Sequence, residues 1–389
     1  MPNKLIYLDH NATTPVDPRV VEKMLPYFTE IYGNAASTDH EFGHVAKQAV
    51  DKARGHIASI INAKADEIIF TSGATESNNI VLFGVAEKYA KKGDHIITCA
   101  TEHKAVLDCC EQLQKMGKQV TYLPVDSTGM VDPDAVRNAI TPQTILISIM
   151  TANNEIGTIA PIAEIGAIAR EYGILFHTDA TQAVGHIPVD VQAMNIDILS
   201  MSAHKIYGPK GIGALYRRRS NPRVQLAPVM YGGGHEKGIR SGTLNVPGIV
   251  GFGEALRIAK RNMSKEVEKY REWTLQMQEQ FEAELGDVYL NGHPTERLPH
   301  NLNISFSGVE SRAVIVKLQD VAVATGSACT SAKVEPSHVI QALGCGDERA
   351  HTAIRVSVGR FNTDVEIDMS IDRIVSAVRE LRRLSLSFA

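Results

Sequence analysis

Six short apolar segments recur between residues 67 and 202, and each is separated from the next by a stretch long enough to cross back over a sheet. They are EIIF (67–70), HIIT (95–98), QVTYL (119–123), TILISI (144–149), ILFHTD (174–179) and DILSMS (197–202). Strands that are apolar on both faces are typical of parallel sheets, because the crossover connections cover both faces of such a sheet with helices. The pattern predicts an α/β fold built on a mostly parallel sheet.

Polar side chains gather at the carboxyl ends of these predicted strands. They are Thr71–Gly73 after the first strand, Asn153–Glu155 after the fourth, Asp179 at the end of the fifth, and His204 and Lys205 after the sixth. Open α/β sheets bind their ligands at the carboxyl ends of the strands. We therefore expect these side chains to form one functional site.

The part of the chain beyond residue 245 has a different pattern. Residues 246–285 have the periodicity and the alternating outer charges of one long amphipathic helix. Strand-like segments (302–306 and 354–358) and helical segments (311–319, 336–343 and 364–384) follow it, as in a small α+β unit. We expect a segment of residues 1–16 that joins a small domain, a large domain of residues 17–255, and the small domain itself over residues 256–389.

Composition narrows the class of protein. With 389 residues, of which 44% are hydrophobic and 22% charged, the chain is a globular protein rather than a collagen, a disordered chain or a coiled coil. Its net charge of −4 favours neither nucleic acid nor an anionic membrane as a direct partner. The N-terminus turns polar early and no run of about 18 apolar residues occurs, so we expect a cytoplasmic protein without a membrane span.

The five cysteines include no CxxC pair, which argues against a disulfide framework and against a four-thiolate zinc site. Cys99 lies in an apolar strand, and Cys109 and Cys110 lie on a predicted helix, so we expect these thiols in the core. Cys329 lies instead in ATGSACTSA (324–332), a loop of small residues that would leave a thiol accessible. It is a candidate nucleophile, with a small buried apolar side chain as the alternative.

Lys205 and Asp179 are the strongest candidates for chemistry. Lys205 lies between a strand and the turn IYGPKGIG, where burial could lower the pKa of an amine that attacks carbonyl groups; a solvated loop lysine is the alternative. Asp179 emerges from a buried strand, where a carboxylate needs a cation or a strong donor. A capping role at the following turn suits the same position.

Two further features point to anionic ligands. The segment SGATESNN (72–79) joins a strand to a helix, where free backbone N–H groups can bind a phosphate; an ordinary helix start capped by Ser72 or Thr75 is the alternative. Arg355, in a strand-like segment, needs a carboxylate from a substrate or from an internal salt bridge.

Other conspicuous residues have ordinary interpretations. His40 and His44 could share a metal, but no third ligand is indicated, so we interpret them as surface residues. The glycines 232–234 are interpreted as a turn. Arg217–Arg219 are interpreted as a solvated strand edge, with a surface for an acidic partner as the alternative.

An amine, a carboxylate, an anion-binding loop and an arginine are together what a pyridoxal 5′-phosphate enzyme needs. Longer motifs run from about residue 5 to 380: YLDHNATTP (7–15), FTSGATESNN (70–79), TEHKAV (101–106), NNEIGT (153–158), HTDATQAVG (177–185), SMSAHKIYGPKGIG (200–213), GGGHEKGIRSGT (232–243), GSACTSA (326–332) and IRVSVGRFNT (354–363). With them the chain resembles the cysteine desulfurases of the NifS/IscS type, in the class V aminotransferase group of fold-type I enzymes. That resemblance implies a mostly parallel seven-stranded sheet covered by helices, together with a smaller α+β domain.

The resemblance also implies roles for individual residues. Lys205 would hold the cofactor covalently, Asp179 would pair with its ring nitrogen, and Asn154 and Gln182 would bind its ring oxygen. The phosphate would be bound by the backbone of Ala74 and the side chains of Thr75, Ser202 and His204, with Thr243 from the second subunit of a homodimer. His103 would stack on the ring and move protons, Arg355 would bind the substrate carboxylate, and Cys329 would take the sulfur of L-cysteine and release alanine.

The implied partners are L-cysteine, a second copy of the chain and a sulfur-acceptor protein, with no resident metal apart from a transient iron–sulfur contact through Cys329. The chain stops at Ala389, where longer members carry a further segment that docks the cluster scaffold. The acceptor therefore stays open between a cluster scaffold, a tRNA-thiolation relay and the DNA phosphorothioation machinery. Selenocysteine lyase, another fold-type I enzyme and a non-catalytic sulfur carrier are the alternatives. Cys329 disfavours an aminotransferase, and intact Lys205, Asp179 and His103 disfavour a carrier without turnover.

Overall fold

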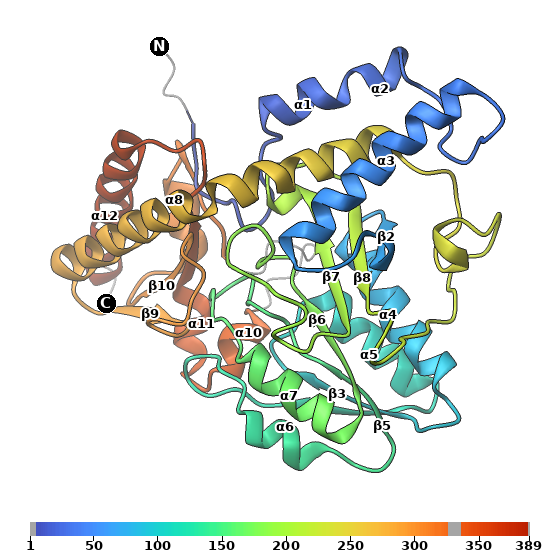
Figure 1. Ribbon diagram of the computed structural model, residues 1–389. Helices are drawn as coiled ribbons and strands as arrows, with labels where there is room; N and C mark the ends of the chain where they lie inside the picture. The colour runs from blue at the N-terminus through green and yellow to red at the C-terminus, as the bar shows by residue number, and fades with distance from the viewer. Residues whose placement is uncertain (1–4, 326–335, 388–389) are drawn as a thin grey trace.

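A seven-stranded sheet forms the centre of the larger part of the molecule (Figure 1). The computed structural model describes residues 5–325 and 336–387, with side chains described to residue 384. The strands, in the order in which they lie side by side, are β2 (Ile68–Thr71), β8 (Gly213–Arg217), β7 (Ile198–Ser202), β6 (Leu175–Asp179), β5 (Thr144–Ser148), β3 (His95–Cys99) and β4 (Gln119–Leu123).

The sheet confirms the expectation of a mostly parallel α/β fold. All six strands expected between residues 67 and 202 are present, shifted by about one residue at most at either end. Strand β8 runs antiparallel to both of its neighbours, β2 and β7, whereas the remaining pairs are parallel. The sheet is therefore mixed, and six of its carboxyl ends lie along one edge.

Helices cover both faces of this sheet (Figure 1). In β2, Ile68 and Phe70 pack into one apolar cluster and Ile69 packs into another, as the alternation of a strand requires. The helices of this part are α1 (Pro18–Met24), α2 (Pro26–Thr29), α3 (Glu41–Ile60), α4 (Ala74–Lys88), α5 (Lys104–Lys115), α6 (Pro133–Ala139) and α7 (Ile162–Tyr172), with short 3₁₀ turns η1 (Ala65–Glu67), η2 (Ala203–Lys205) and η3 (Glu236–Gly238).

Helix α8 (Val246–Leu285) matches the long helix expected from the sequence. It begins where the Asn245 side chain accepts a hydrogen bond from the Gly248 N–H at 3.1 Å. Its first half crosses α3 closely, because a Cβ on Gly253 would lie 2.7 Å from the Cα of Ala53. Its second half contributes Trp273 to a separate apolar cluster. The division that we predict at residue 255 falls within this continuous helix and stays a prediction.

That second cluster surrounds a three-stranded antiparallel sheet in the order β12–β10–β9. The elements of this part are β9 (Val288–Asn291), β10 (Asn301–Phe306), α9 (Ser311–Lys317), β11 (Val321–Ala322), α10 (His338–Ala342), α11 (Asp347–Thr352), β12 (Ala353–Ser357) and α12 (Asp364–Ser387). Strand β1 (Ile6–Tyr7) pairs with β11, so the N-terminal segment lies against the last third of the chain.

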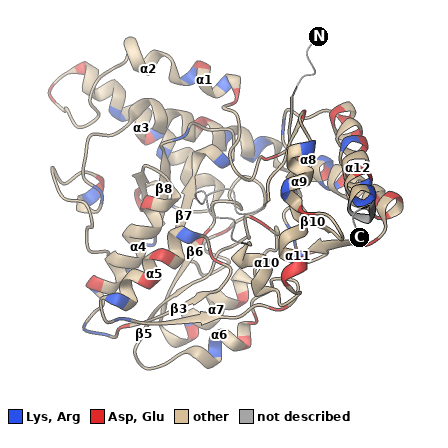
Figure 2. Ribbon diagram, turned by 180° about the vertical axis from the view of Figure 1, so that it is seen from behind, with Lys and Arg blue, Asp and Glu red and all other residues tan. Residues whose placement is uncertain are grey.

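Charged side chains lie mainly on the helices and loops, and the strands of the central sheet carry few (Figure 2). Within the described ranges, no helix is both long and apolar enough to cross a membrane.

Candidate active site

A cavity of about 580 Å³ lies at the carboxyl ends of the central strands. It brings together most of the residues that we predicted for the site from separate parts of the sequence. Those that line it are Ala74, Thr75, His103, Asn154, Asp179, Gln182, Ser202, His204, Lys205 and Arg355. Thr243 does not line it, and Cys329 lies outside the described residues.

Lys205 ends η2, directly after β7. Its Nζ donates hydrogen bonds to the backbone carbonyls of Asn11 at 2.6 Å and Ala12 at 2.8 Å. Thr14 fixes the same loop from both sides, because its N–H donates to the His204 carbonyl and its Oγ1 accepts from the Tyr207 N–H. The N-terminal segment therefore positions the lysine, a role that the sequence reasoning missed although YLDHNATTP contains these residues.

Asp179 closes β6 and is 5% exposed. Its Oδ2 accepts a hydrogen bond from the Asn78 side chain at 2.7 Å, and its Oδ1 accepts one from the Thr181 N–H at 3.0 Å. The capping interpretation of this residue is therefore confirmed, since the carboxylate orders the following turn. Asp179 also lines the cavity, and its pairing with a cation stays a prediction. Asn78 was missed, although it lies in the motif SGATESNN.

The start of α4 forms one wall of the cavity. Gly73, with φ 157°, is the capping residue and makes no side-chain cap, so the alternative of a helix capped by Ser72 or Thr75 is wrong. The physical reason is position: Gly73, which has no side chain, occupies the N-cap, Ser72 precedes it, and Thr75 already lies inside the helix. The first N–H groups of α4 have no acceptor within the helix and are available to an anion.

His204 lies beside this wall and shares a hydrogen bond of 3.1 Å between its Nδ1 and Thr13 Oγ1. Burial, together with the positive charges of Lys205 and Lys210, lowers the pKa of His204 to about 4. The imidazole is therefore neutral near pH 7, and one ring nitrogen carries a proton that it can donate.

His103 caps α5, and its Nδ1 accepts a hydrogen bond from the Ala105 N–H at 3.1 Å. In the neutral ring, the proton therefore resides on Nε2. The preceding residue, Glu102, is fully buried, and its Oε1 accepts from the Met150 N–H at 2.6 Å. Burial raises the pKa of Glu102 well above its usual value, and the nearby Asp179 raises it further. Sequence reasoning gave Glu102 no role.

Arg355, on β12, is 3% exposed. One guanidinium nitrogen donates to Asp9 Oδ1 at 2.7 Å and another donates to the Asn154 carbonyl at 3.0 Å. Its Nε has no hydrogen-bond partner in the described part of the chain. The internal salt bridge, which was the alternative interpretation of Arg355, is therefore present. The Nε group is a further donor that is available to a ligand.

Gln182 is fixed by a reciprocal pair of hydrogen bonds with Asn11. Its Nε2 donates to the Asn11 carbonyl at 2.9 Å, and its Oε1 accepts from the Asn11 side chain at 3.1 Å. Asn11 thus contacts both Gln182 and Lys205, which makes it a central residue of this wall.

Among the residues given ordinary interpretations, the solvated strand edge expected at Arg217–Arg219 is wrong at Arg218, which is 6% exposed. This buried guanidinium forms an ion pair with Asp197 at 3.1 Å and donates to the carbonyls of Val191 and Ile196, and these partners offset the loss of solvent.

His40 caps α3 and His44 bonds the Thr38 carbonyl, and the described residues hold no cluster of three metal-ligating side chains. Cys99, Cys109 and Cys110 are buried. Burial raises the pKa of Cys99 to about 11, so this thiol stays protonated near pH 7.

Comparisons with known proteins agree with this geometry. The family described as aminotransferase class-V matches residues 6–369. A cysteine desulfurase IscS of Anaeromyxobacter dehalogenans strain 2CP-C is 53% identical over 98% of this chain and 94% of its own length.

Solved structures are also similar. A NifS-like protein has a TM-score of 0.90 and 36% identity, covering 96% of this chain and 99% of its own. A structure described as SspA in complex with cysteine has a TM-score of 0.82 and 37% identity, covering 92% of this chain and all (100%) of its own.

Proposed function

Since this chain belongs to the aminotransferase class-V family, we propose that it is a cysteine desulfurase, which converts L-cysteine to L-alanine and keeps the sulfur on Cys329 as a persulfide. The observation that carries the proposal is the convergence of Lys205, Asp179, His103 and Arg355 on one cavity. An amine, a carboxylate, a proton carrier and a carboxylate-binding cation are the groups that the reaction requires.

The cofactor is pyridoxal 5′-phosphate, and the residues present fit it. Thr181 Oγ1 and Arg355 Nε are buried without a hydrogen-bond partner in the described part of the chain, and both residues line the cavity. The start of α4 offers free N–H groups, and neutral His204 offers one more donor without adding charge. When bound, the cofactor supplies an electron sink for the Cα of the substrate.

In this proposal Lys205 would hold the cofactor covalently. Asp179 would pair with the protonated ring nitrogen, and its hydrogen bonds with Asn78 and Thr181 orient the carboxylate. Asn154 and Gln182 would bind the ring oxygen. The Ala74 backbone, Thr75, Ser202 and His204 would bind the phosphate.

The substrate carboxylate binds Arg355. Because Asp9 already accepts from one guanidinium nitrogen, the substrate uses the donors that Asp9 leaves free. His103 carries protons on Nε2, since its Nδ1 is engaged by the backbone of its own helix.

The sulfur step balances without an added oxidant. The thiolate of Cys329 attacks the sulfur of the bound cysteine, and a new S–S bond forms. The Cβ–S bond of the substrate breaks, its electron pair stays on Cβ, and that carbon takes up a proton to become the methyl group of alanine.

The proposal includes a homodimer in which Thr243 completes the phosphate site of the partner subunit. Thr243 is exposed in its own chain, as are the apolar side chains of Met230 and Tyr231 in the same segment. A second copy would cover these side chains. Sedimentation of a fully active monomer would contradict this arrangement.

The sulfur acceptor in this proposal is an iron–sulfur scaffold or a thiolation relay protein. The compartment in the proposal is the cytoplasm, where thiols are kept reduced, as a nucleophilic Cys329 requires.

The test is to incubate the purified protein with L-cysteine and dithiothreitol and to quantify alanine and sulfide together. A desulfurase forms the two in equal amounts, and Lys205→Ala should form neither. Pyruvate in place of alanine, or alanine without sulfide, would refute the proposed reaction. Parallel assays with L-selenocysteine distinguish a selenocysteine lyase, which would prefer that substrate.

A further inference from the structure

A second cavity, of about 380 Å³, lies between α1 and α8 and shares no lining residue with the active site. Its lining is dominated by cationic side chains and includes no carboxylate among the described residues. The lining residues are Arg19, Arg257, Ile258, Arg261, Asn262 and Lys265. We call it the α8 cavity.

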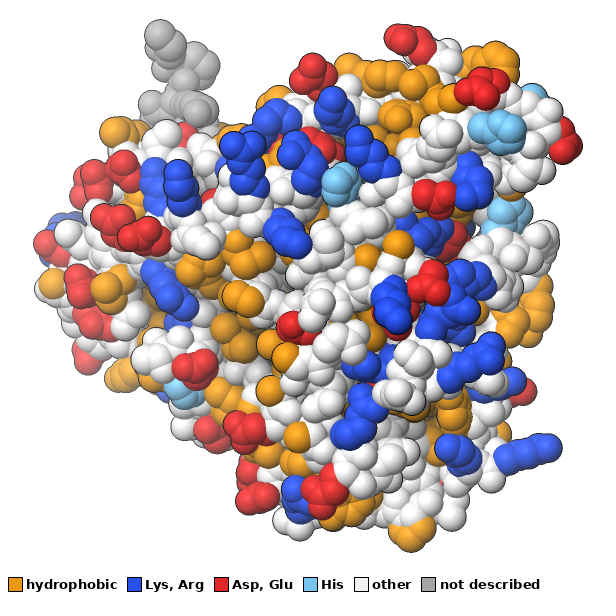
Figure 3. Space-filling model, in the orientation of Figure 1, with side chains coloured by type: hydrophobic (Ala, Val, Ile, Leu, Met, Phe, Trp, Pro, Cys, Tyr) orange, Lys and Arg blue, Asp and Glu red, His pale blue; other side chains and the backbone are white. Residues whose placement is uncertain are grey.

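The sequence spacing of α8 places three of these cations in one row. Arg257, Arg261 and Lys265 are four residues apart, so they lie on the same face of the helix at intervals of about 6 Å. Lys and Arg side chains gather over the middle of α8 and the neighbouring α1 in Figure 3. This local excess of positive charge occurs in a chain whose net charge is −4.

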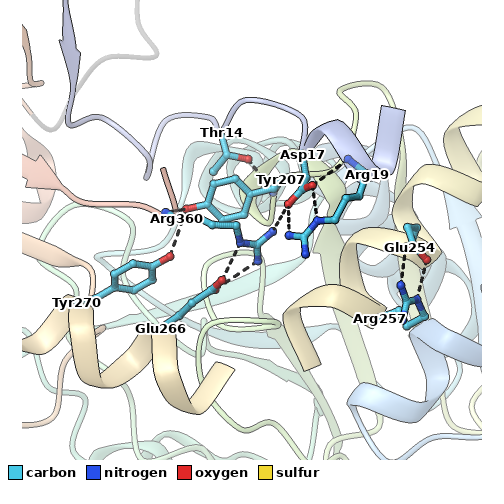
Figure 4. Close-up of polar contacts among 9 residues, drawn as sticks. All are labelled: Thr14, Asp17, Arg19, Tyr207, Glu254, Arg257, Glu266, Tyr270 and Arg360. Atoms are coloured by element: carbon cyan, nitrogen blue, oxygen red, sulfur yellow. Dashed lines mark hydrogen bonds and ion pairs between the residues drawn. The ribbon is translucent and has the colours of Figure 1, made fainter. Parts of the chain in front are cut away.

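Two of the cations, Arg19 and Arg257, form ion pairs with carboxylates that do not line the cavity (Figure 4). Arg19 donates to both oxygens of Asp17, at 2.9 and 2.6 Å, and Asp17 is 1% exposed. Arg257 donates to both oxygens of Glu254 at 2.7 Å. Neither carboxylate lines the cavity, so these ion pairs orient the guanidinium groups without filling the space in front of them.

The other two cations, Arg261 and Lys265, are exposed, and neither forms an ion pair with any described residue. Nearby, burial lowers the pKa of His56; the charges of Lys52 and Arg257 also lower it, and that of Glu254 raises it.

We propose that the α8 cavity binds a multiply charged phosphate compound. Guanidinium groups match phosphate oxygens with two parallel hydrogen bonds. Arg261 and Lys265, which form no ion pair with a described residue, line the cavity beside two ion-paired arginines, so a ligand with several negative charges suits it better than a single carboxylate. The volume fits a small molecule such as pyrophosphate or a phosphorylated metabolite. Asn262 adds an uncharged donor and acceptor to the same wall.

The test is calorimetric titration of the holoenzyme, whose own phosphate site is already filled by the cofactor. Pyrophosphate and glycerol 3-phosphate are titrated separately, so that a free polyphosphate and a phosphate ester are distinguished. We expect saturable binding of at least one of them at one site per chain, weakened at least tenfold in Arg261→Gln/Lys265→Gln.

The matched control is Arg312→Gln/Lys64→Gln, which removes the same charges from exposed positions that also lack an ion pair with any described residue. It should bind as tightly as the wild type. Equal weakening in both variants would mean that only the overall charge matters, and would overturn the proposal. Absence of saturable binding, or binding of a poly-glutamate peptide but of neither phosphate compound, would also overturn it.

Discussion

The active-site cavity and the α8 cavity are both lined by cations, but the two are constructed differently. Arg355 in the first is almost wholly buried and is fixed by partners from distant segments. Arg261 and Lys265 in the second are exposed and project from a single helix. A site assembled from many buried hydrogen bonds is preorganised for chemistry, whereas exposed cations on one helix can adapt to a ligand at little cost in stability.

The largest loss of activity is expected from substitution of Cys329. Cys329→Ala should reduce alanine formation by about three orders of magnitude or more, because no thiolate is left to take the sulfur. The absorbance of the bound cofactor should persist, since Lys205 and Asp179 are unchanged. Steady-state assays and absorbance spectra measure the two effects.

The controls for that variant are Cys99→Ala, Cys109→Ala and Cys345→Ala, each of which should stay within a few-fold of wild type. After a cysteine pulse, mass spectrometry should find the added sulfur atom on the Cys329 peptide. Detection on another cysteine would refute the assignment.

The two regions should also differ in their response to acid. Burial lowers the pKa of His177, beneath the active site, to about 4, whereas hydrogen bonds from Arg19 lower the pKa of Asp17, beside the α8 cavity, to about 2. The neutral buried histidine stabilises the fold less as pH falls from about 6.5 to 4, because the unfolded chain takes up the proton first. The contribution of Asp17 persists above its unfolded pKa of about 3.8 and is lost as pH falls toward 2.

His177→Gln should therefore flatten the loss of stability between pH 7 and 4, by up to about 3 kcal/mol. Glutamine retains groups that can bond Ser148 and Ser200, the present partners of the ring. Urea unfolding at several pH values measures the slope, and an unchanged slope would mean that other groups control the acid response.

Substitution of Arg355 should reduce activity by an intermediate amount. Arg355→Ala should lower kcat/KM by the equivalent of about 1.5–3 kcal/mol, because a charge-assisted hydrogen bond to the substrate carboxylate is lost. The cofactor spectrum should not change. Unaltered kcat and KM would contradict the role proposed for this arginine.

The smallest changes in stability and activity are expected from substitutions in the α8 cavity. Arg261→Gln/Lys265→Gln should change the free energy of unfolding by less than about 0.5 kcal/mol and leave alanine formation unchanged, since neither side chain forms an ion pair with a residue that the structure describes. Urea unfolding and the alanine assay are sufficient. A loss above about 1 kcal/mol would show that these cations support the fold and remove the contrast between the two cavities.

The same contrast explains what could be predicted from the sequence. The buried strands are short continuous apolar segments and α8 has a periodic apolar pattern, so the positions of both could be predicted closely. The antiparallel direction of β8 could not, because a short apolar segment carries no mark of its direction. The pairing of Arg355 with Asp9 joins residues 346 positions apart, and no local pattern specifies such a partner.

Within the site, the sequence indicated the residues whose side chains have distinctive chemistry. It did not indicate the residues that position those side chains. Asn11 and Asn78 act through hydrogen bonds with Lys205, Gln182 and Asp179, which depend on how the segments pack. An asparagine in a motif is compatible with many roles. The roles of all the predicted site residues, Thr243 and Cys329 among them, and the domain boundaries stay predictions.

The N-terminal segment has a consequence for the time at which activity arises. Asn11, made among the first residues of the chain, supports Lys205 and itself donates its N–H to Ser357, which is made among the last. Asp9 likewise receives its arginine partner only near the end of synthesis. A nascent chain can complete the central sheet on the ribosome, but its lysine site lacks part of its framework until β12 has emerged. In the proposed function, the framework of the cofactor site is therefore complete only after β12 has been synthesised.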